Sequence, residues 1–127
     1  MKNTLSNKIL IVDDDPNILL SLEFLLSKNN YQVFIARNGL EALSAIEQEV
    51  PDIVLLDVMM PDLDGYEVCE FIRKKKTYAH AKVIFISARS KESDIEKGYE
   101  MGADLYVVKP FSTRTLLEKI TELAGAV

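Results

Sequence analysis

The chain has 127 residues, of which 48% are hydrophobic and 28% are charged, and its formal net charge is −5 at pH 7. This composition is typical of one soluble globular domain and argues against a disordered or membrane-spanning chain, while the negative charge argues against direct binding of nucleic acid. Residues 1–8 are polar and lack the apolar stretch of a secretory signal, so we expect a cytoplasmic protein without a membrane partner.

The predicted elements alternate between short apolar segments and amphipathic segments. Strands are predicted over residues 8–13, 31–36, 52–57, 82–87 and 104–108, which are rich in Val, Ile, Leu and aromatic residues. Helices are predicted over 16–28, after Asn38-Gly39, from about Asp64, over 91–101 and after the N-cap Ser112. Such alternation predicts a single α/β domain over 1–127, with its core at 8–123, a parallel sheet and helices on both faces.

The apolar spacing within three helices predicts which side chains face the core. These are, in the first helix, Ile18, Leu22, Leu25 and Leu26; in the second, Leu40, Leu43 and Ile46; and in the last, Leu116, Leu117, Ile120 and Leu123. Leu20 and Phe24 lie off the first stripe, so we expect them to be partly exposed. Gly98, inside the fourth helix, costs about 1 kcal/mol relative to Ala, which predicts a helix that is easily remodelled.

Three further features have structural interpretations. The basic run Arg73-Lys74-Lys75-Lys76 falls in the last turn of the third helix, where cations complement the backbone carbonyls, so we interpret it as a solvated helix end, with a partner contact as the alternative. Cys69 lies on the apolar face of the same helix, which predicts a packed thiol. His80 has no Cys or His neighbour at ligand spacing, and a surface imidazole is expected.

The run Ile53-Val54-Leu55-Leu56 ends in Asp57. Four consecutive apolar residues indicate a strand covered on both faces, so Asp57 is expected at its carboxyl end, where open α/β sheets place their ligand crevices. An aspartate after a strand also serves as a turn former or helix cap, and this segment alone leaves both interpretations open.

A second apolar run, residues 9–12, is followed by Asp13-Asp14-Asp15-Pro16. Pro16 suits the first helical position and Asp15 the N-cap before it, which gives Asp15 a structural role. Asp13 and Asp14 are then left to join Asp57 as a set of hard oxygen ligands suited to Mg²⁺. Without a cation, adjacent acids repel one another and raise the pKa of the least solvated carboxyl group.

Two later strands end in groups that complement an anion. Residues 82–86 lead to the hydroxyl of Ser87, and residues 104–108 lead to the ammonium of Lys109. Each is open to a simpler interpretation, because Ser often starts helices and Lys often extends from strand ends into solvent. Phosphoryl transfer to a carboxylate requires an oriented nucleophile and neutralisation of the charge on the incoming oxygens. A metal ion, a lysine and a hydroxyl placed around that carboxylate together supply both.

At these motifs the chain resembles the receiver domains of two-component response regulators, from about Lys8 to Leu123. The matching segments are residues 9–16, 57–65, 85–88 and 102–111. The resemblance implies a flavodoxin-like fold with five parallel strands in the order 2-1-3-4-5. This strand order comes from the resemblance and not from the spacing of residues.

The resemblance also implies a phosphorylation site. Asp57 would be the phosphoacceptor. Asp14 would coordinate Mg²⁺ together with Asp57 and the backbone carbonyl of Met59, and Asp13 would complete the acidic cluster through metal-bound water.

Other site residues are implied in the same way. Ser87 would hydrogen-bond a phosphoryl oxygen, and Lys109 would pair first with the Asp57 carboxylate and then with its phosphate. The Lys109-Pro110 bond would be cis. Tyr106 would be the switch aromatic, with an ordinary half-buried strand aromatic as the alternative.

The implied partners are a histidine kinase or a histidine phosphotransfer protein as phosphoryl donor. An output protein or domain would bind the surface of the fourth helix, fifth strand and fifth helix, and a phosphorylation-dependent homodimer is a further option. The domain would catalyse only its own phosphorylation and dephosphorylation. Met59 offers no strong acceptor to orient a water, and Arg89 can reach across the site, so we expect slow self-dephosphorylation.

Two alternatives compete with this interpretation. A haloacid dehalogenase-type phosphohydrolase would use Asp13 and Asp15 with Mg²⁺, but that class follows its Asp-x-Asp with small or hydroxyl residues where Pro16-Asn17 stands, and it leaves Asp57 and Lys109-Pro110 without a role. A receiver-like binding module that is never phosphorylated is disfavoured by the intact set of acids, hydroxyl and lysine.

Overall fold

The structure, a computed structural model, describes residues 7–125. Its elements are β1 (Lys8–Val12), α1 (Pro16–Lys28), β2 (Gln32–Ala36), α2 (Gly39–Glu49), β3 (Ile53–Asp57), α3 (Gly65–Lys74), β4 (Lys82–Ser87), α4 (Glu92–Glu100), β5 (Leu105–Val108) and α5 (Thr113–Gly125). The strands form one parallel sheet in the order β2-β1-β3-β4-β5, which confirms the expected fold class and strand order. The expectation drawn from residues 1–8 rests mainly on residues 1–6, which lie outside the described part of the chain.

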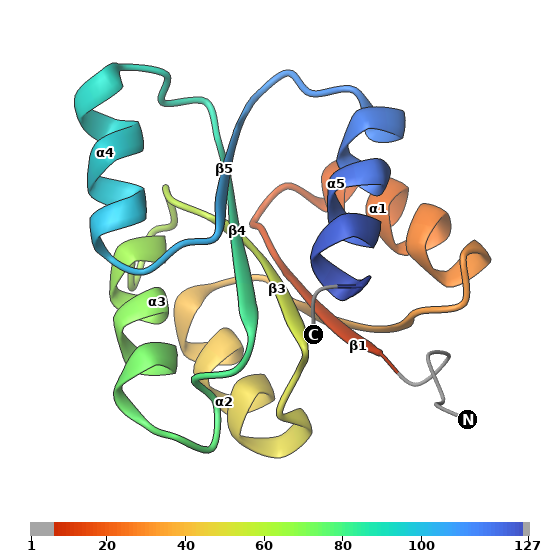
Figure 1. Ribbon diagram of the computed structural model, residues 1–127, viewed down its shortest axis with the longest axis horizontal. Coiled ribbons are helices and arrows are strands. Elements are labelled where there is room, and N and C mark those ends of the chain that lie inside the picture. The colour runs from red at the N-terminus through yellow and green to blue at the C-terminus, as the bar shows by residue number, and fades with distance from the viewer. Residues whose placement is uncertain (1–6, 126–127) are drawn as a thin grey trace.

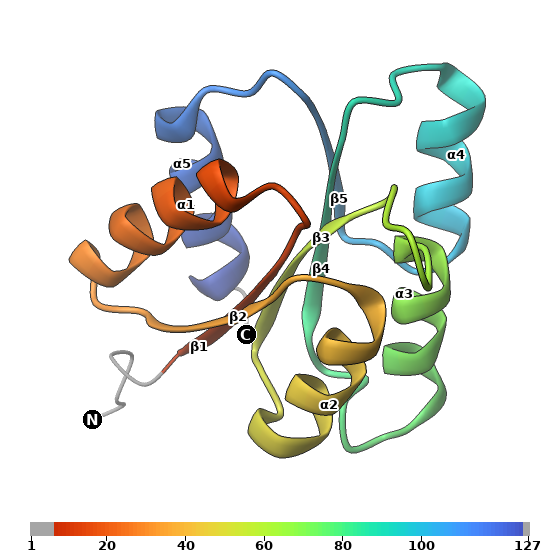
Figure 2. The ribbon, with the colours of Figure 1, turned by 180° about the vertical axis from the view of Figure 1, so that it is seen from behind.

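Helices cover both faces of the sheet. In Figures 1 and 2, α1 and α5 lie together on one face, and α2, α3 and α4 lie on the other. Successive strand residues serve opposite layers: Ile9 and Ile11 pack in the cluster that contains α1 and α5, and Leu10 and Val12 pack in the cluster with α2 and α3. Because both faces are covered, every residue of β3 is buried, as expected for a continuous apolar strand in a parallel sheet.

The strand register brings four strand ends to one edge of the sheet. Val12 pairs with Leu56, Asp57 with Ile86, and Ser87 with Val108. The residues that end or follow β1, β3, β4 and β5 therefore meet at the carboxyl edge, although they are separated by up to 96 positions in the sequence.

The helix faces agree only partly with the predictions from spacing. In α1, Leu22 and Leu26 are buried while Leu20 and Phe24 are exposed, as predicted. The inward orientation predicted for Leu40 in α2 is wrong, since this side chain is 63% exposed. The buried side of α2 consists of Gly39, Ala42 and Ile46, and Leu40 turns away from it.

The buried residues of α1 and α5 also differ in part from those predicted by apolar spacing. Leu19 is buried although it lay outside the predicted stripe of α1, whereas Ile18 and Leu25 are only half-buried. In α5, Leu116 and Ile120 are buried, and Leu117 and Leu123 are half-buried against the same core. Spacing gives the direction of an apolar stripe, but the neighbouring elements decide how wide a stripe they cover.

The interpretation of the basic run as a solvated helix end is wrong for Arg73. Its guanidinium donates hydrogen bonds to the carbonyl oxygens of Ala79, Ala81 and Gly102 and lies 2.9 Å from the carboxylate of Asp104. Arg73 therefore ties the end of α3 to the loops before β4 and β5, whereas the following lysines are exposed.

Cys69 is fully buried, and its thiol donates to the carbonyl oxygen of Met101. Burial raises the pKa of this thiol to about 11, and the prediction of a packed thiol is confirmed. His80 is exposed, as predicted, and its imidazole lies 3.7 Å from the carboxylate of Asp52.

Candidate functional site

Buried polar side chains gather at the carboxyl edge of the sheet. When tyrosine and cysteine are counted with the hydrophobic core, the buried polar or charged side chains among the described residues are those of Asp13, Asp57 and Ser87. They come from the ends of β1, β3 and β4. Because burying polar groups is unfavourable unless they are paired, their concentration at one edge marks a site rather than a packing solution.

Three carboxylates lie close together there. Oxygens of Asp13, Asp14 and Asp57 all lie within 4.8 Å of one another. The neighbouring Asp15 does not join them: it is the N-cap of α1, and its carboxylate accepts a hydrogen bond from the amide of Asn17 at 2.9 Å. The predicted N-cap role of Asp15 is thus confirmed, and Asp13 and Asp14 lie close to Asp57.

Asp57 is held in a setting that disfavours its charge. Desolvation by burial, followed by the neighbouring charge of Asp13, raises the pKa of the Asp57 carboxyl to about 6. The ammonium of Lys109 and a hydrogen bond of 3.2 Å from the amide of Met59 oppose this rise. Desolvation of Asp57 and repulsion from the neighbouring acids together exceed the compensation that Lys109 and the Met59 amide provide, and a bound cation would relieve the repulsion.

Lys109 contacts two of the three acids. Its ammonium donates to Asp13 at 3.1 Å and lies 3.6 Å from Asp57, so the pairing expected with Asp57 is shared, with Asp13 the nearer partner. Hydrogen bonding and charge from these acids outweigh desolvation and raise the pKa of Lys109. The backbone also fixes this residue, since the Lys109 amide donates to the carbonyl of Ser87 at 2.8 Å. The peptide bond from Lys109 to Pro110 is cis.

A chain of hydrogen bonds joins the hydroxyl at the end of β4 to the aromatic residue on β5. The amide of Arg89 donates to the Ser87 hydroxyl oxygen at 3.1 Å. The phenol of Tyr106 donates to the carbonyl oxygen of Arg89 at 2.9 Å. Tyr106 is buried against Phe85, so Ser87 and Tyr106 are connected through a single residue.

Gly98 has a role that its helix propensity alone did not predict. A Cβ atom at this position would lie 2.8 Å from the ring of Tyr106 and 3.2 Å from that of Phe85. The glycine therefore lets α4 lie directly over the buried Tyr106 ring. The sequence showed a weak point in a helix, whereas the tertiary structure shows a close approach between a helix and a strand.

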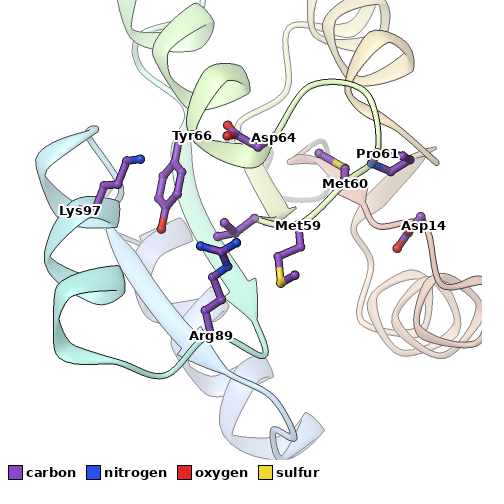
Figure 3. Close-up of a pocket in the computed structure, with 9 residues that line it drawn as sticks. Asp14, Met59, Met60, Pro61, Asp64, Tyr66, Arg89 and Lys97 are labelled. Carbon is purple, nitrogen blue, oxygen red and sulfur yellow. The ribbon is translucent and has the colours of Figure 1, made fainter.

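A cavity of about 440 Å³ opens beside these residues (Figure 3). Its lining consists of Asp14, Val58, Met59, Met60, Pro61, Asp64, Tyr66, Arg89 and Lys97. Met59 is 49% exposed there, and the Arg89 guanidinium lies 3.8 Å from the carboxylate of Asp94. Both residues expected to govern water access thus line the same opening.

The comparison with known families identifies this architecture. A family model for the response regulator receiver domain matches residues 9–121. The chain belongs to this family. Within residues 7–125, no helix of this receiver domain is both long enough and apolar enough to cross a membrane.

Several solved structures are similar to this receiver domain. A CheY-like response regulator receiver domain protein from Methanospirillum hungatei is 36% identical, with a TM-score of 0.89, and 95% of each chain is covered. The beryllofluoride-activated DrrB receiver domain is 36% identical, with a TM-score of 0.85, covering 93% of this chain and 97% of that one. The signal receiver domain of a signal transduction histidine kinase from Syntrophus aciditrophicus is 31% identical, with a TM-score of 0.88, covering 96% and 92%.

Two residues of this receiver domain escaped the sequence analysis. Tyr66 is buried at the start of α3, and its phenol donates to the carbonyl oxygen of Asp94 in α4 at 3.3 Å. Asp62 accepts two hydrogen bonds from the first turn of α2. No spacing rule links either residue to its partner, because each pair joins segments more than twenty residues apart.

Proposed function

We propose that this chain is a phosphoacceptor receiver that takes a phosphoryl group onto Asp57 from a histidine kinase or a histidine phosphotransfer protein. The observation that supports this most strongly is the buried Asp57 carboxylate at the end of a central strand, with Lys109 3.6 Å away. The carboxylate attacks phosphorus, the bond from phosphorus to the donor's imidazole nitrogen breaks, and that nitrogen keeps the electron pair. The products are an acyl phosphate and a free imidazole.

The flanking residues would divide the work of this transfer. The Lys109 ammonium holds the Asp57 carboxylate in place before transfer and neutralises a phosphoryl oxygen afterwards. The Ser87 hydroxyl, now an acceptor for the Arg89 amide, donates to another phosphoryl oxygen. In this assignment the domain catalyses only its own phosphorylation and dephosphorylation.

The donor set fits Mg²⁺. Three carboxylates within 4.8 Å of one another, one of them with a raised pKa, form an anionic oxygen-lined site of the kind that this hard cation prefers. Asp14, Asp57 and the backbone carbonyl of Met59 would hold the ion, and Asp13 would complete the acidic cluster. When bound, Mg²⁺ supplies charge neutralisation for the phosphoryl oxygens.

The arrangement also suggests how phosphorylation would be signalled. A phosphoryl group adds about −1.5 to −2 charges and draws the Ser87 hydroxyl towards it. Because Arg89 joins Ser87 to Tyr106, this movement changes the contacts of Tyr106 and of α4 above it. The α4-β5-α5 face would then bind an output protein or domain, or a second phosphorylated copy. We place this signalling in the cytoplasm, without direct nucleic-acid binding.

Phosphorylation can be tested by incubating the protein with Mg²⁺ and acetyl phosphate and measuring its intact mass. The parent should gain one phosphoryl group, and Asp57→Asn should gain none because its amide is a poor nucleophile. Asp15→Asn, which keeps an N-cap oxygen and all three acids of the cluster, is the matched control and should be phosphorylated like the parent. A haloacid dehalogenase-type mechanism would instead require Asp15 and not Asp57. Equal phosphorylation of the parent and Asp57→Asn would contradict the assignment.

Beryllofluoride with Mg²⁺ tests the switch separately. The amide resonances of Tyr106 and Ser87 should shift together with that of Asp57, and Ser87→Ala should reduce the distant shifts while keeping the near ones. Shifts confined to the surroundings of Asp57 would mean phosphorylation without switching. Lys109→Ala should weaken the distant shifts more than it weakens Mg²⁺ binding.

We further propose that the acyl phosphate is long-lived. Met59 and Arg89 both line the opening: Met59 presents a thioether that orients water poorly, and the Arg89 guanidinium lies 3.8 Å from the Asp94 carboxylate. Met59→Asn supplies an amide that can orient the attacking water, so it should shorten the lifetime. Parallel decay measurements in excess Mg²⁺ compare the two proteins, and equal lifetimes would refute the water-access argument.

A further inference from the structure

The loop between β3 and α3, residues 58–64, contains Met59 and contacts the start of α2. Its two ends are fixed by local hydrogen bonds: the Met59 amide donates to Asp57 at 3.2 Å, and the Gly65 amide donates to the carbonyl of Val58 at 2.9 Å. Between these points, among the residues that the structure describes, two hydrogen bonds join residues 60–63 to a helix or strand, and Asp62 accepts both of them.

Asp62 caps a helix to which it does not belong. One carboxylate oxygen accepts from the amide of Gly39 at 2.9 Å, and the other accepts from the amide of Leu40 at 3.0 Å. The next two amides of α2, those of Glu41 and Ala42, donate to the side chain and the carbonyl of Asn38. All four amides of the first turn are therefore satisfied, two of them by Asp62.

Two further observations fit a built contact. A Cβ atom on Gly39 would lie 2.5 Å from the Cβ atom of Leu63 and 2.9 Å from its carbonyl oxygen, so the glycine allows the loop to approach the helix. The hydrogen bonds from Leu40 and Gly39 hold the pKa of the Asp62 carboxyl below its usual range. An anion at a helix N-terminus is also favoured by the helix dipole.

We propose that Asp62 is a positioning residue of the phosphorylation site, which fastens the β3-α3 loop to α2 and thereby holds the Met59 backbone in place for Asp57 and the metal ion. This inference rests on the proposed function, because it assigns Met59 a place in that site. It makes α2, which contributes no acid to the site, part of the site's support.

A matched pair of variants separates positioning from helix stability. Asp62→Ala and Asn38→Ala each remove a side-chain cap from α2, but only Asp62 belongs to the loop. Magnesium titration followed by amide resonances should show a loss of affinity of about fivefold or more for Asp62→Ala. The Asn38→Ala variant should keep the parent's affinity. The Asp62→Asn variant, which retains one carbonyl acceptor, should fall between the parent and Asp62→Ala.

Coupling between two sites is reciprocal, so the metal should also act on α2. Adding Mg²⁺ to the parent should shift the amide resonances of Gly39 and Leu40, and Asp62→Ala should abolish those shifts. Equal Mg²⁺ affinities for Asp62→Ala and Asn38→Ala would overturn the inference. If Asp62→Ala does not fold, parental affinity in Asp62→Asn together with unchanged Gly39 shifts would overturn it.

Failure of the proposed metal site would be visible separately. If the parent binds no Mg²⁺, that site is refuted, and hydrogen exchange of the Met59 amide in metal-free protein still decides the role of Asp62. Faster exchange in Asp62→Ala than in Asn38→Ala supports positioning, whereas equal rates in the two variants contradict it.

Discussion

Helices α3 and α4 lie on the same face of the sheet, yet they are held in different ways. Helix α3 begins with a capping box between Asp64 and Glu67 and buries Gly65, Tyr66, Val68, Cys69 and Ile72. Helix α4 follows Lys91, whose side chain makes no capping hydrogen bond, and its one fully buried residue is Gly98. Helix α3, which follows the strand that ends in Asp57, is thus anchored by extensive packing, whereas α4, which lies over Tyr106, contributes fewer buried residues to the core.

A few polar contacts supplement the packing of Ile95 and Gly98 at α4. The Tyr66 phenol donates to the carbonyl of Asp94 at 3.3 Å, the Tyr99 phenol oxygen accepts from the amide of Tyr106 at 3.2 Å, and the Lys97 ammonium lies 4.5 Å from the centre of the Tyr66 ring. Such contacts can be exchanged without exposing a core. The comparison indicates that the fold holds the surroundings of Asp57 rigidly, whereas the surroundings of Tyr106 can rearrange at lower cost.

The largest effect is expected from adding a methyl group at the start of α3, by changing Gly65 to Ala. In Gly65→Ala the new Cβ atom would meet the carbonyl oxygen of Asp57 and lie 2.9 Å from the Cα atom of Val58, and backbone atoms in a packed sheet cannot move aside. We expect a loss of about 3 kcal/mol in the free energy of unfolding, measured by chemical denaturation. A cost below that of the corresponding change at Gly98 would contradict the contrast.

The buried Asp57 carboxylate, which ends the strand before α3, should make the free energy of unfolding depend on pH. The pKa of Asp57 in the folded protein, about 6, lies above the usual 3.8. The folded state therefore binds this proton more tightly, and the contribution of Asp57 to stability rises as the pH falls from 7 through 6 towards 4. Asp57→Asn should be more stable than the metal-free parent at pH 7, and this advantage should shrink by about 1–3 kcal/mol by pH 4.

Denaturant unfolding with a chelator present, repeated across this pH range, measures that difference. Asp52→Asn is a useful control, because it removes a carboxylate at the opposite edge of the sheet. A stability difference between Asp57→Asn and the parent that does not change with pH would show that burial of the Asp57 charge is not unfavourable.

Adding the corresponding methyl group in α4 should lower the free energy of unfolding less, and its structural effect should stay local. In Gly98→Ala the new Cβ atom meets the rings of Tyr106 and Phe85, which are side chains and not backbone, and alanine gains about 1 kcal/mol in helix propensity. We expect a net loss of about 1 kcal/mol or less, together with greater exposure of Tyr106 in its ring resonances. An unchanged Tyr106 ring would place the accommodation elsewhere.

The smallest expected effect comes from supplying the cap that α4 lacks. Lys91→Ser introduces a preferred N-cap hydroxyl and removes a cation from the helix N-terminus, so we expect a gain of about 0.5 kcal/mol. Hydrogen exchange should slow in the first turns of α4 and stay unchanged in α3. Asp64→Ala, which breaks the capping box of α3, should have the opposite sign at its own helix.

Much of the site could be predicted because chain order and strand periodicity are local properties. Apolar runs gave the strands to within one residue, and a parallel sheet necessarily brings strand ends to one edge, so Asp13, Asp57, Ser87 and Lys109 could be grouped from the sequence. The order of the strands is not local, and it was available only through resemblance to a family.

Only the tertiary structure decided contacts that join distant segments. Leu40 faces solvent because Gly39 and Ala42 form the covered side of α2, and Arg73 is bonded to three carbonyls because two loops fold around it. The hydrogen bonds of Asp62 to α2 and the contact of Gly98 with Tyr106 belong to the same class. The sequence by itself determined which residues end each strand, since periodicity is set by neighbours in the chain, while partners brought together by folding were decided by packing.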